Sequence, residues 1–317
     1  MISCSAFQSN GVGLDEKKIE VQTSSGVVSN DLGSLDLGFV SWQDIPFAQP
    51  PVGDLRWRAP RPLDSPSQII SPKDDTACVQ KASVYAGATG EGIVGSEDCL
   101  YLDITAPIDF KDKSYPVMFW IHGGGNTSGL KDYYDYSKLV STRDVVVVRT
   151  NYRLGALGWF THPSIQGEQE GIDKTSNFGT LDIIQSLKWV QTNISGFGGD
   201  PRNVTIFGES AGGHNVFALL ASPMADGLFH KAISQSGYTS SYSLEDAVNE
   251  NGTNRLIERG SSQIIDREFG SGVDRDLLRS ELKEMDARAF IGLYYQEEGI
   301  DSIPLTTRDD IVIHKIG

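Results

Sequence analysis

The sequence is poor in cysteine, in long apolar runs and in positive charge. Its 317 residues include three cysteines, and no apolar run approaches the roughly 18 residues that a membrane-spanning helix requires. With 27 Lys and Arg against 42 Asp and Glu, the formal net charge is -15, which disfavours a polyanionic partner. We therefore expect no membrane span and no nucleic-acid partner, whereas small uncharged or cationic substrates suit this charge.

Two further absences concern cofactors and export. No metal-ligand spacing and no phosphate-binding loop is present, so we expect neither a cofactor nor a metal ion. Residues 1–17 lack the basic start and the apolar stretch of about seven residues of an intact secretory signal, and we expect them to be disordered. No linker divides the rest, so residues 1–317 are predicted to form one domain, whose oligomeric state the sequence leaves open.

What is present suits a globular protein, because 39% of the residues are apolar and there are 34 glycines. Alternation over residues 18–28 predicts an edge hairpin that turns at 24–26. The four prolines of residues 38–60 argue against a helix. That stretch is therefore predicted to be an ordered loop, pinned to the core by Trp42, Phe47 and Trp57.

Strands and helices then alternate along the chain. The unbroken apolar runs at 116–125 and 144–153 are typical of strands buried on both faces of a parallel sheet. Further strands are predicted at 99–107, 203–208 and 231–237, helices at 176–194 and 211–222, and a charged, helical segment at 238–317. The first helix is expected to be amphipathic, with Ser176 or Asn177 as its N-cap. This order predicts an α/β fold with a central, mostly parallel sheet flanked by helices.

The motif G-E-S-A-G at 208–212 lies directly between a predicted strand and a predicted helix. A serine on such a sharp turn presents its hydroxyl group beyond the end of the sheet, and glycines flank it because a Cβ there would collide with neighbouring backbone. Ser210 is therefore the candidate nucleophile. A serine that only caps the following helix would not account for the paired glycines.

The motif H-G-G-G at 122–125 ends another predicted strand. Glycines there allow backbone N–H groups to turn toward a substrate oxygen, and such donors stabilise the oxyanion of a tetrahedral intermediate. We predict that the N–H groups of Gly124 and Gly125, with that of Ala211, form an oxyanion hole. A flexible turn is the alternative for this motif taken alone.

Cys78 and Cys99 bracket a glycine-rich segment of about 20 residues. Spacing alone leaves two interpretations open: a disulfide, which would favour a secreted or periplasmic protein, or two reduced thiols in a cytosolic one.

Longer stretches resemble the type-B carboxylesterases, the family of cholinesterases, liver carboxylesterases and bacterial para-nitrobenzyl esterases. FGGDPRNVTIFGESAG (197–212) is similar to the active-site signature of that family, and EDCLYLDITAP (97–107) to its second signature, with Thr105 where a larger apolar residue is usual. QPPVGDLRWRAP and NYRLGALGWF fit as well. The resemblance runs from about Lys18 to at least Gly237.

The resemblance implies an α/β-hydrolase fold and hydrolysis of carboxylic esters of small molecules. It also implies Ser210 as nucleophile, an oxyanion hole of Gly124, Gly125 and Ala211, and a Cys78–Cys99 disulfide. Two structural ion pairs are expected from it, namely Arg56–Glu97 and Arg153–Asp182.

The base and the acid of a catalytic triad are not found among the predicted site residues. The nucleophile of an α/β-hydrolase is followed in the chain by the acid and then by the histidine. None of the five histidines occupies the family's base position, and the ending IPLTTRDDIVIHKIG resembles the segment shortly before the acid. We therefore expect a C-terminally truncated chain whose acid and base lie beyond Gly317, and which is nearly inactive alone.

Three alternatives stay open. The scaffold serves as a non-catalytic binding or adhesion protein in some relatives, although these typically lose the elbow serine, and amide or lactam hydrolysis would use the same groups. The tyrosines of residues 131–139 either line the active-site entrance or pack on the surface.

Overall fold

The structure is a computed structural model. It describes residues 18–31, 37–249, 260–296, 299–300 and 306–314. The segment 1–17, which was expected to be disordered, lies outside the described residues. Among the described residues no helix is long and apolar enough to cross a bilayer.

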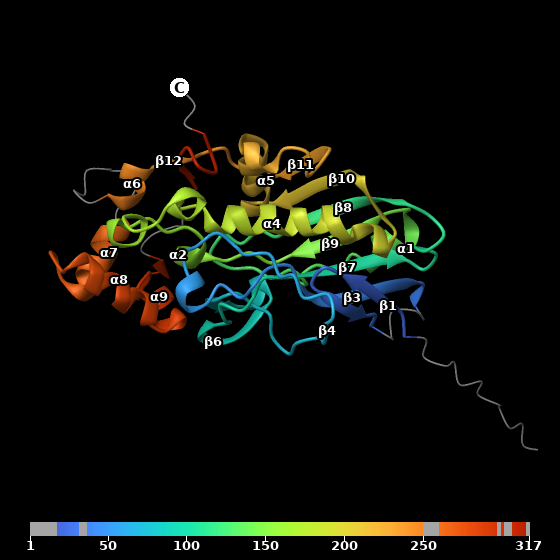
Figure 1. Cartoon of the computed structure of the whole chain (residues 1–317), viewed down its shortest axis with the longest axis horizontal. Helices are drawn as coiled ribbons and strands as arrows, with labels where there is room; N and C mark the ends of the chain where they lie inside the picture. Colours follow the sequence, from blue (N-terminus) through green and yellow to red (C-terminus); the bar gives the residue numbers. More distant parts are fainter. Residues whose placement is uncertain (1–17, 32–36, 250–259, 297–298, 301–305, 315–317) are drawn as a thin grey trace, which may run out of the picture.

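A six-stranded mixed sheet forms the centre of the molecule, with strand order β11-β10-β8-β9-β7-β3. Its strands are β3 (Phe39–Pro46), β7 (Tyr101–Pro107), β8 (Tyr115–Ile121), β9 (Val146–Thr150), β10 (Gly199–Glu209) and β11 (Lys231–Gln235). The pairings from β11 to β9 are parallel, and those of β9 with β7 and of β7 with β3 are antiparallel. In Figure 1, β10, β8, β9, β7 and β3 follow one another from top to bottom.

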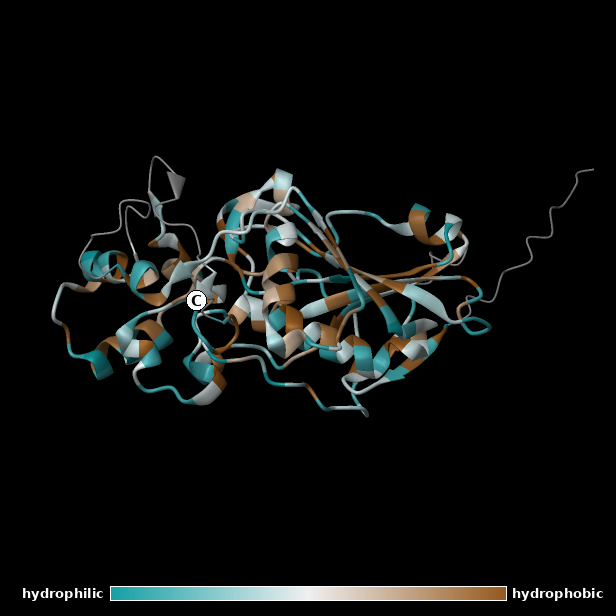
Figure 2. Cartoon of the chain, turned by 90° about the horizontal axis from the view of Figure 1, so that it is seen from above, coloured by the Kyte–Doolittle hydropathy of each residue, from teal (hydrophilic) through white to brown (hydrophobic). Residues whose placement is uncertain are grey.

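Continuous apolar runs account for the central strands. Every residue of β7 and of β9 is buried, as expected for strands covered on both faces. Figure 2 shows the hydrophobic colour concentrated on the strands and on the helices beside them. The strands predicted at 99–107, 116–125, 144–153, 203–208 and 231–237 are all present, as β7, β8, β9, β10 and β11.

The prediction of a loop over residues 38–60 is wrong in its first part, because residues 39–46 form strand β3. This strand tolerates Pro46 because it lies at the sheet edge and ends at that residue. The pairing with β7 shifts register between Trp42 and Ile45, where Asp44 adopts φ +56°. Trp42, Phe47 and Trp57 are fully buried, so the predicted anchoring is confirmed.

Helices cover both faces of the sheet and gather at one end of it. They are α1 (Ser137–Thr142), α2 (Gly155–Gly158), α3 (Pro163–Gln166), α4 (Phe178–Asn193), α5 (Ala211–Ala221), α6 (Leu244–Val248), α7 (Ser261–Phe269), α8 (Arg275–Glu284) and α9 (Ala287–Gly292). Figure 1 shows α6 to α9 together at the left end of the molecule.

Helix α4 is buried on nearly all sides rather than amphipathic, since 12 of its 16 residues are buried. The turn of the predicted hairpin, formed by β1 (Glu20–Thr23) and β2 (Gly26–Ser29), contacts this helix. In this contact Trp189 Nε1 donates to Ser25 Oγ at 2.8 Å. Asn177 stands at the N-cap position as predicted, but its side chain does not cap the helix.

The remaining strands lie outside the central sheet. They are β4 (Ile69–Ile70), β5 (Gln80–Ser83), β6 (Ala88–Val94), β12 (Tyr242–Ser243), β13 (Tyr295–Gln296), β14 (Gly299–Ile300) and β15 (Thr307–Arg308). The segment 238–317 is therefore not helical throughout, because it also contributes β12 to β15. The parallel pairing of β12 with β15 brings residues 306–308 back beside residues 242–243.

The covalent and ionic links implied by the family resemblance are present. Cys78 and Cys99 form a disulfide. Arg56 pairs with Glu97 at 2.6 Å and Arg153 with Asp182 at 2.7 Å. Both ion pairs are largely buried, so the loss of one partner would leave an unpaired charge inside the protein.

Candidate active site

Ser210 stands on a tight corner between β10 and α5. Its backbone has φ +56° and ψ -120°, a conformation that non-glycine residues rarely adopt and that a rigid surround must maintain. That surround includes Gln235 of β11, whose carbonyl accepts from the Ser210 N–H at 2.8 Å. The corner is thus held from the neighbouring strand as well as by its own helix.

The glycines around Ser210 are required by close backbone approach, as predicted. A Cβ on Gly208 would lie 2.5 Å from the carbonyl carbon and oxygen of Gly212. A Cβ on Gly212 would lie 2.1 Å from the carbonyl oxygen of Ile121, at the end of β8. The start of α5 therefore rests directly on the strand from which the HGGG motif departs.

We call residues 122–131, which follow β8, the glycine segment. A Cβ on Gly123 would lie 3.3 Å from the Cβ of Ser210, so the segment passes directly beside the candidate nucleophile. Gly124 and Gly125 have φ +98° and +63°, which favour glycine at both positions. The structure thus brings together the two motifs that are 85 residues apart in the sequence.

The hydrogen bonds that the carbonyl groups of this region accept indicate the direction of the neighbouring N–H groups. In a trans peptide the C=O and the following N–H point in opposite directions. The Gly123 carbonyl lies 2.9 Å from His122 Nδ1, and the Gly124 carbonyl accepts from the N–H groups of Thr127 and Ser128 at 3.1 and 3.0 Å. The N–H groups of Gly124 and Gly125 are directed away from those partners, and no acceptor for either is found among the described residues.

The same argument applies to Ala211. The carbonyl of Ser210 accepts from the N–H of His214 at 3.0 Å, so the N–H of the Ser210–Ala211 peptide points out of the N-terminus of α5. The first N–H groups of a helix have no acceptor within the helix and carry partial positive charge. Ala211 therefore presents a donor of the kind that an oxyanion requires.

His122 supports the glycine segment rather than acting as a base. Its ring stacks on Tyr152 at 4.3 Å, and burial lowers its pKa to about 4, so the imidazole is neutral at neutral pH. A carbonyl can only accept, so the bond to Gly123 assigns the proton to Nδ1. Tyr152 also donates to the His122 carbonyl at 2.6 Å.

Two asparagines that the sequence analysis did not single out join the glycine segment to α5. Asn126, with φ +59°, and Asn215 are both buried, and Asn215 Nδ2 donates to Asn126 Oδ1 at 3.0 Å. The Asn126 carbonyl also accepts from Gly155 N–H at 2.8 Å. The sequence offered one signal, namely an asparagine directly after three glycines, where a left-handed conformation is common.

A cavity of about 200 Å³ lies beside the glycine segment. Its lining includes the side chains of Tyr85, Leu130, Tyr133 and Tyr134, and Glu209, next to the candidate nucleophile, supplies a carboxylate. Of the two alternatives for the tyrosines of residues 131–139, the structure supports the lining role for Tyr133 and Tyr134. Both also remain exposed at 44 and 45%.

Among the described residues no histidine is hydrogen-bonded to Ser210. His214 lies one turn along α5 from Ser210, but Nε2 lies 2.8 Å from Thr306 Oγ1 and Nδ1 lies 2.8 Å from the Tyr238 carbonyl. Burial lowers its pKa as well. The ring of His230 accepts from Val204 N–H, and His314 is exposed at the end of the described chain.

The segment 306–314 returns to this side of the molecule. Thr306 contacts His214 as described, and Asn177 Nδ2 donates to the Thr307 carbonyl at 2.9 Å. Asp309 is buried and accepts from Asn177 Nδ2 at 3.0 Å and from the N–H of Val312 at 2.9 Å. The carboxylate-bearing end of the chain is therefore packed against the starts of α4 and α5.

Comparison with known proteins defines the class. A family model described as "Carboxylesterase family" matches residues 17–264. A solved structure named PNB esterase superposes with a TM-score of 0.76 at 32% identity, over 93% of this chain and 58% of that one. The fold is the α/β-hydrolase fold, and the chain belongs to the Carboxylesterase family.

Curated relatives agree with this assignment. The para-nitrobenzyl esterase of Bacillus subtilis (strain 168) is 45% identical over 222 residues, which cover 68% of this chain and 44% of that protein. The fumonisin B1 esterase of Sphingopyxis macrogoltabida is 42% identical over 229 residues, which cover 70% of this chain and 40% of that protein. The chain thus spans less than half the length of these two relatives.

Proposed function

We propose that the chain carries the nucleophile and the oxyanion hole of a serine carboxylic-ester hydrolase. The observation that supports this most directly is the approach of the glycine segment to the Ser210 corner, where a Cβ on Gly123 would lie 3.3 Å from the Cβ of Ser210. The N–H groups of Gly124, Gly125 and Ala211, for which no acceptor is found among the described residues, are the proposed oxyanion donors. The esterase names of the relatives are consistent with this chemistry.

In the proposed reaction Ser210 Oγ attacks the carbonyl carbon of a small-molecule ester. The negative charge that develops on the carbonyl oxygen is stabilised by the N–H groups of Gly124, Gly125 and Ala211, each worth on the order of 10²–10³ in rate. The alcohol leaves, and water then hydrolyses the acyl-serine. The tyrosine-lined cavity beside the glycine segment accommodates one part of the ester.

We propose that the general base comes from a residue that these 317 positions do not include, because no hydrogen bond joins Ser210 Oγ to any of the five histidines among the described residues. The family resemblance implies that the acid, too, lies beyond residue 317.

Loss of the base from a serine hydrolase lowers kcat by about 10⁶ and leaves roughly 10³–10⁴ over water. Labelling by a fluorophosphonate needs the same activated serine as turnover, so the test uses a version of the protein that includes the base. Incubation of this base-containing version with a fluorophosphonate should attach the phosphonyl group to the peptide that contains Ser210, and Ser210→Ala should remove the label.

Ser236 provides a matched control, since it is exposed, lies just after β11 and also has positive φ, at +53°. Ser236→Ala should leave the labelling unchanged. Labelling that persists in Ser210→Ala would refute the nucleophile, and a folded wild type that stays unlabelled would favour the non-catalytic binding protein. Amide and lactam hydrolysis, which the same groups could perform, is separated from ester hydrolysis by comparing matched p-nitrophenyl ester and p-nitroanilide substrates.

A further inference from the structure

The glycine segment has no regular secondary structure of its own, yet its backbone must be held accurately. Gly124, Gly125 and Gly129 all have positive φ, and glycines are the residues with the most conformational freedom to lose. A displacement of about 1 Å at such a site lowers catalysis by about 10². Side chains from elsewhere in the fold must therefore fix the segment.

One anchor is Gln80 of β5, which is fully buried. Its side-chain amide makes two bonds to Gly129: Nε2 donates to the carbonyl at 2.9 Å, and Oε1 accepts from the N–H at 2.9 Å. Gln80 Nε2 also donates to the carbonyl of Cys78 at 3.1 Å, next to the disulfide. Gln80 thus replaces the backbone partner that a strand would supply.

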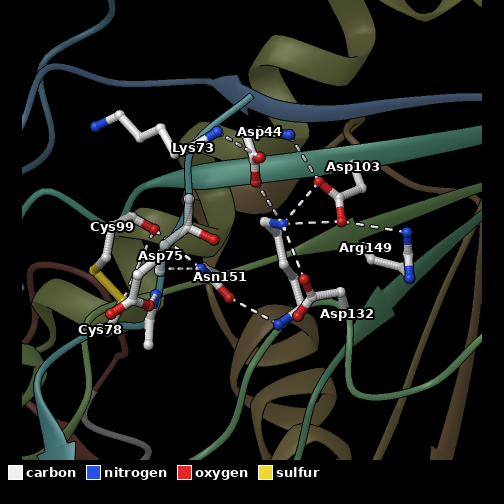
Figure 3. Close-up of polar contacts among 12 residues, drawn as sticks. Asp44, Lys73, Asp75, Cys78, Cys99, Asp103, Asp132, Arg149 and Asn151 are labelled. Carbon is white, nitrogen blue, oxygen red and sulfur yellow. Dashed lines mark hydrogen bonds and ion pairs between the residues drawn. A yellow bond between two sulfur atoms is a disulfide. The ribbon is translucent and has the colours of Figure 1, made fainter. Parts of the chain in front are cut away.

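The second anchor is Lys131, which is 1% exposed and ends the glycine segment. Its Nζ lies 2.9 Å from Asp44 Oδ1 and 2.8 Å from Asp103 Oδ1. The Lys131 N–H donates to Asn151 Oδ1 at 2.8 Å. Figure 3 shows the carboxyl groups of Asp44 and Asp103 turned toward a common point, and Asn151 lies on the opposite side of that point from Asp103.

These partners belong to the sheet. Asp44 lies in the irregular part of β3, Asp103 in β7, and Arg149 in β9, where its guanidinium lies 3.2 Å from Asp103. Two buried cations therefore face two buried carboxylates, and the half-exposed Asp132 lies 3.7 Å from Lys131 Nζ. The Asp44 N–H also donates to Asp103 Oδ1 at 2.9 Å, and this bond holds the Asp103 carboxylate in the position where it pairs with Lys131.

We propose that Lys131 is a positioning residue for the oxyanion hole. Its ion pairs with Asp103 and Asp44 fasten the end of the glycine segment to the sheet, so that the N–H groups of Gly124 and Gly125 keep their direction toward Ser210. The inference rests on the proposed function. Lys131 itself touches neither substrate nor Ser210 in this scheme.

The test uses the base-containing version with Lys131→Met, which keeps much of the side-chain volume and removes the charge. Its matched control is Arg56→Met, which breaks another buried ion pair, with Glu97; none of the hydrogen-bond partners of the Arg56 side chain belongs to residues 122–131. Both variants should unfold at lower denaturant concentration. Under conditions where both are folded by circular dichroism, only Lys131→Met should slow fluorophosphonate labelling of Ser210, by about 10².

A merely structural role predicts a different result, namely equal labelling rates for the two folded variants and the wild type. That result would overturn the proposal, as would an equal slowing in Arg56→Met. Loss of labelling in the wild type would instead refute the proposed function.

Hydrogen exchange of the peptide that spans residues 122–131 tests the anchoring without any activity. Lys131→Met should raise exchange there at least tenfold, and Arg56→Met should leave it unchanged. Unchanged protection in Lys131→Met would overturn the proposal whatever the labelling shows.

Discussion

Gly212→Ala should open the corner that carries Ser210. A Cβ at this position would lie 2.1 Å from the carbonyl oxygen of Ile121 and 2.8 Å from that of His122. Both atoms belong to backbone, so no side-chain rotation relieves the contact. Helix α5 and the end of β8 must separate by about 1 Å before the closest distance reaches 3.0 Å.

The expected magnitude follows from two opposed effects. Overpacking of a well-packed site costs about 1–3 kcal/mol, and a clash with backbone lies at the upper end of that range. Alanine gains about 1 kcal/mol over glycine inside a helix. The free energy of unfolding should therefore fall by about 2 kcal/mol, and a 1 Å shift of the Ser210 corner should slow covalent labelling by about 10².

Urea unfolding followed by tryptophan fluorescence measures the first effect, and the rate of fluorophosphonate labelling measures the second. Gly292→Ala is the matched control, since Gly292 ends α9 and a Cβ there would have no atom within 4 Å. That control should gain about 0.5 kcal/mol and label normally. A Gly212→Ala protein with wild-type stability and labelling would show that the close approach of α5 to β8 is not as described.

Three further predictions concern stability. Burial lowers the pKa of His122 to about 4, against 6.5 in the unfolded chain. The contribution of neutral His122 to the free energy of unfolding is therefore complete above pH 6.5, and ~3 kcal/mol is lost as the pH falls toward 4. In His122→Gln the urea midpoints measured at pH 7 and pH 4.5 should lie closer together than in the wild type. The Cys78–Cys99 disulfide closes a loop with a sequence separation of 21, so the double serine variant should lose ~3 kcal/mol in the same measurement, and an unchanged midpoint would contradict this. Asp103→Asn removes a buried counter-charge of Lys131 and Arg149 and should lower the free energy of unfolding by about 3–5 kcal/mol, whereas a loss below about 1 kcal/mol would mean that water reaches the cluster.

The features predicted well from the sequence are those in which local pattern and chemistry agree. The apolar run before His122 predicted β8, and the glycines around Ser210 predicted a turn with close backbone approach, which the 2.5 Å distance from a Cβ on Gly208 to the carbonyl group of Gly212 confirms. In both cases neighbouring residues in the sequence are also neighbours in space. Short-range pattern is then sufficient.

The features that were missed depend on partners far along the chain. Residues 39–46 form a strand because β7 pairs with them, and their proline is harmless only at a sheet edge. Helix α4 is buried on most sides, and one of its contacts comes from Ser25 in the β1–β2 turn, 164 residues before Trp189. Lys131 has no sequence signature as an anchor, since Asp44 and Asp103 are separated from it by 87 and 28 residues.

The way in which the glycine segment is fastened has a consequence for folding order. Its anchors, Asp44, Gln80, Asp103 and Asn151, lie both before and after it in the chain. Contacts of such long sequence separation form only after large loops have closed. We therefore expect the proposed oxyanion donors to become organised late in folding, once β3, β7, β9 and the disulfide-linked loop have assembled.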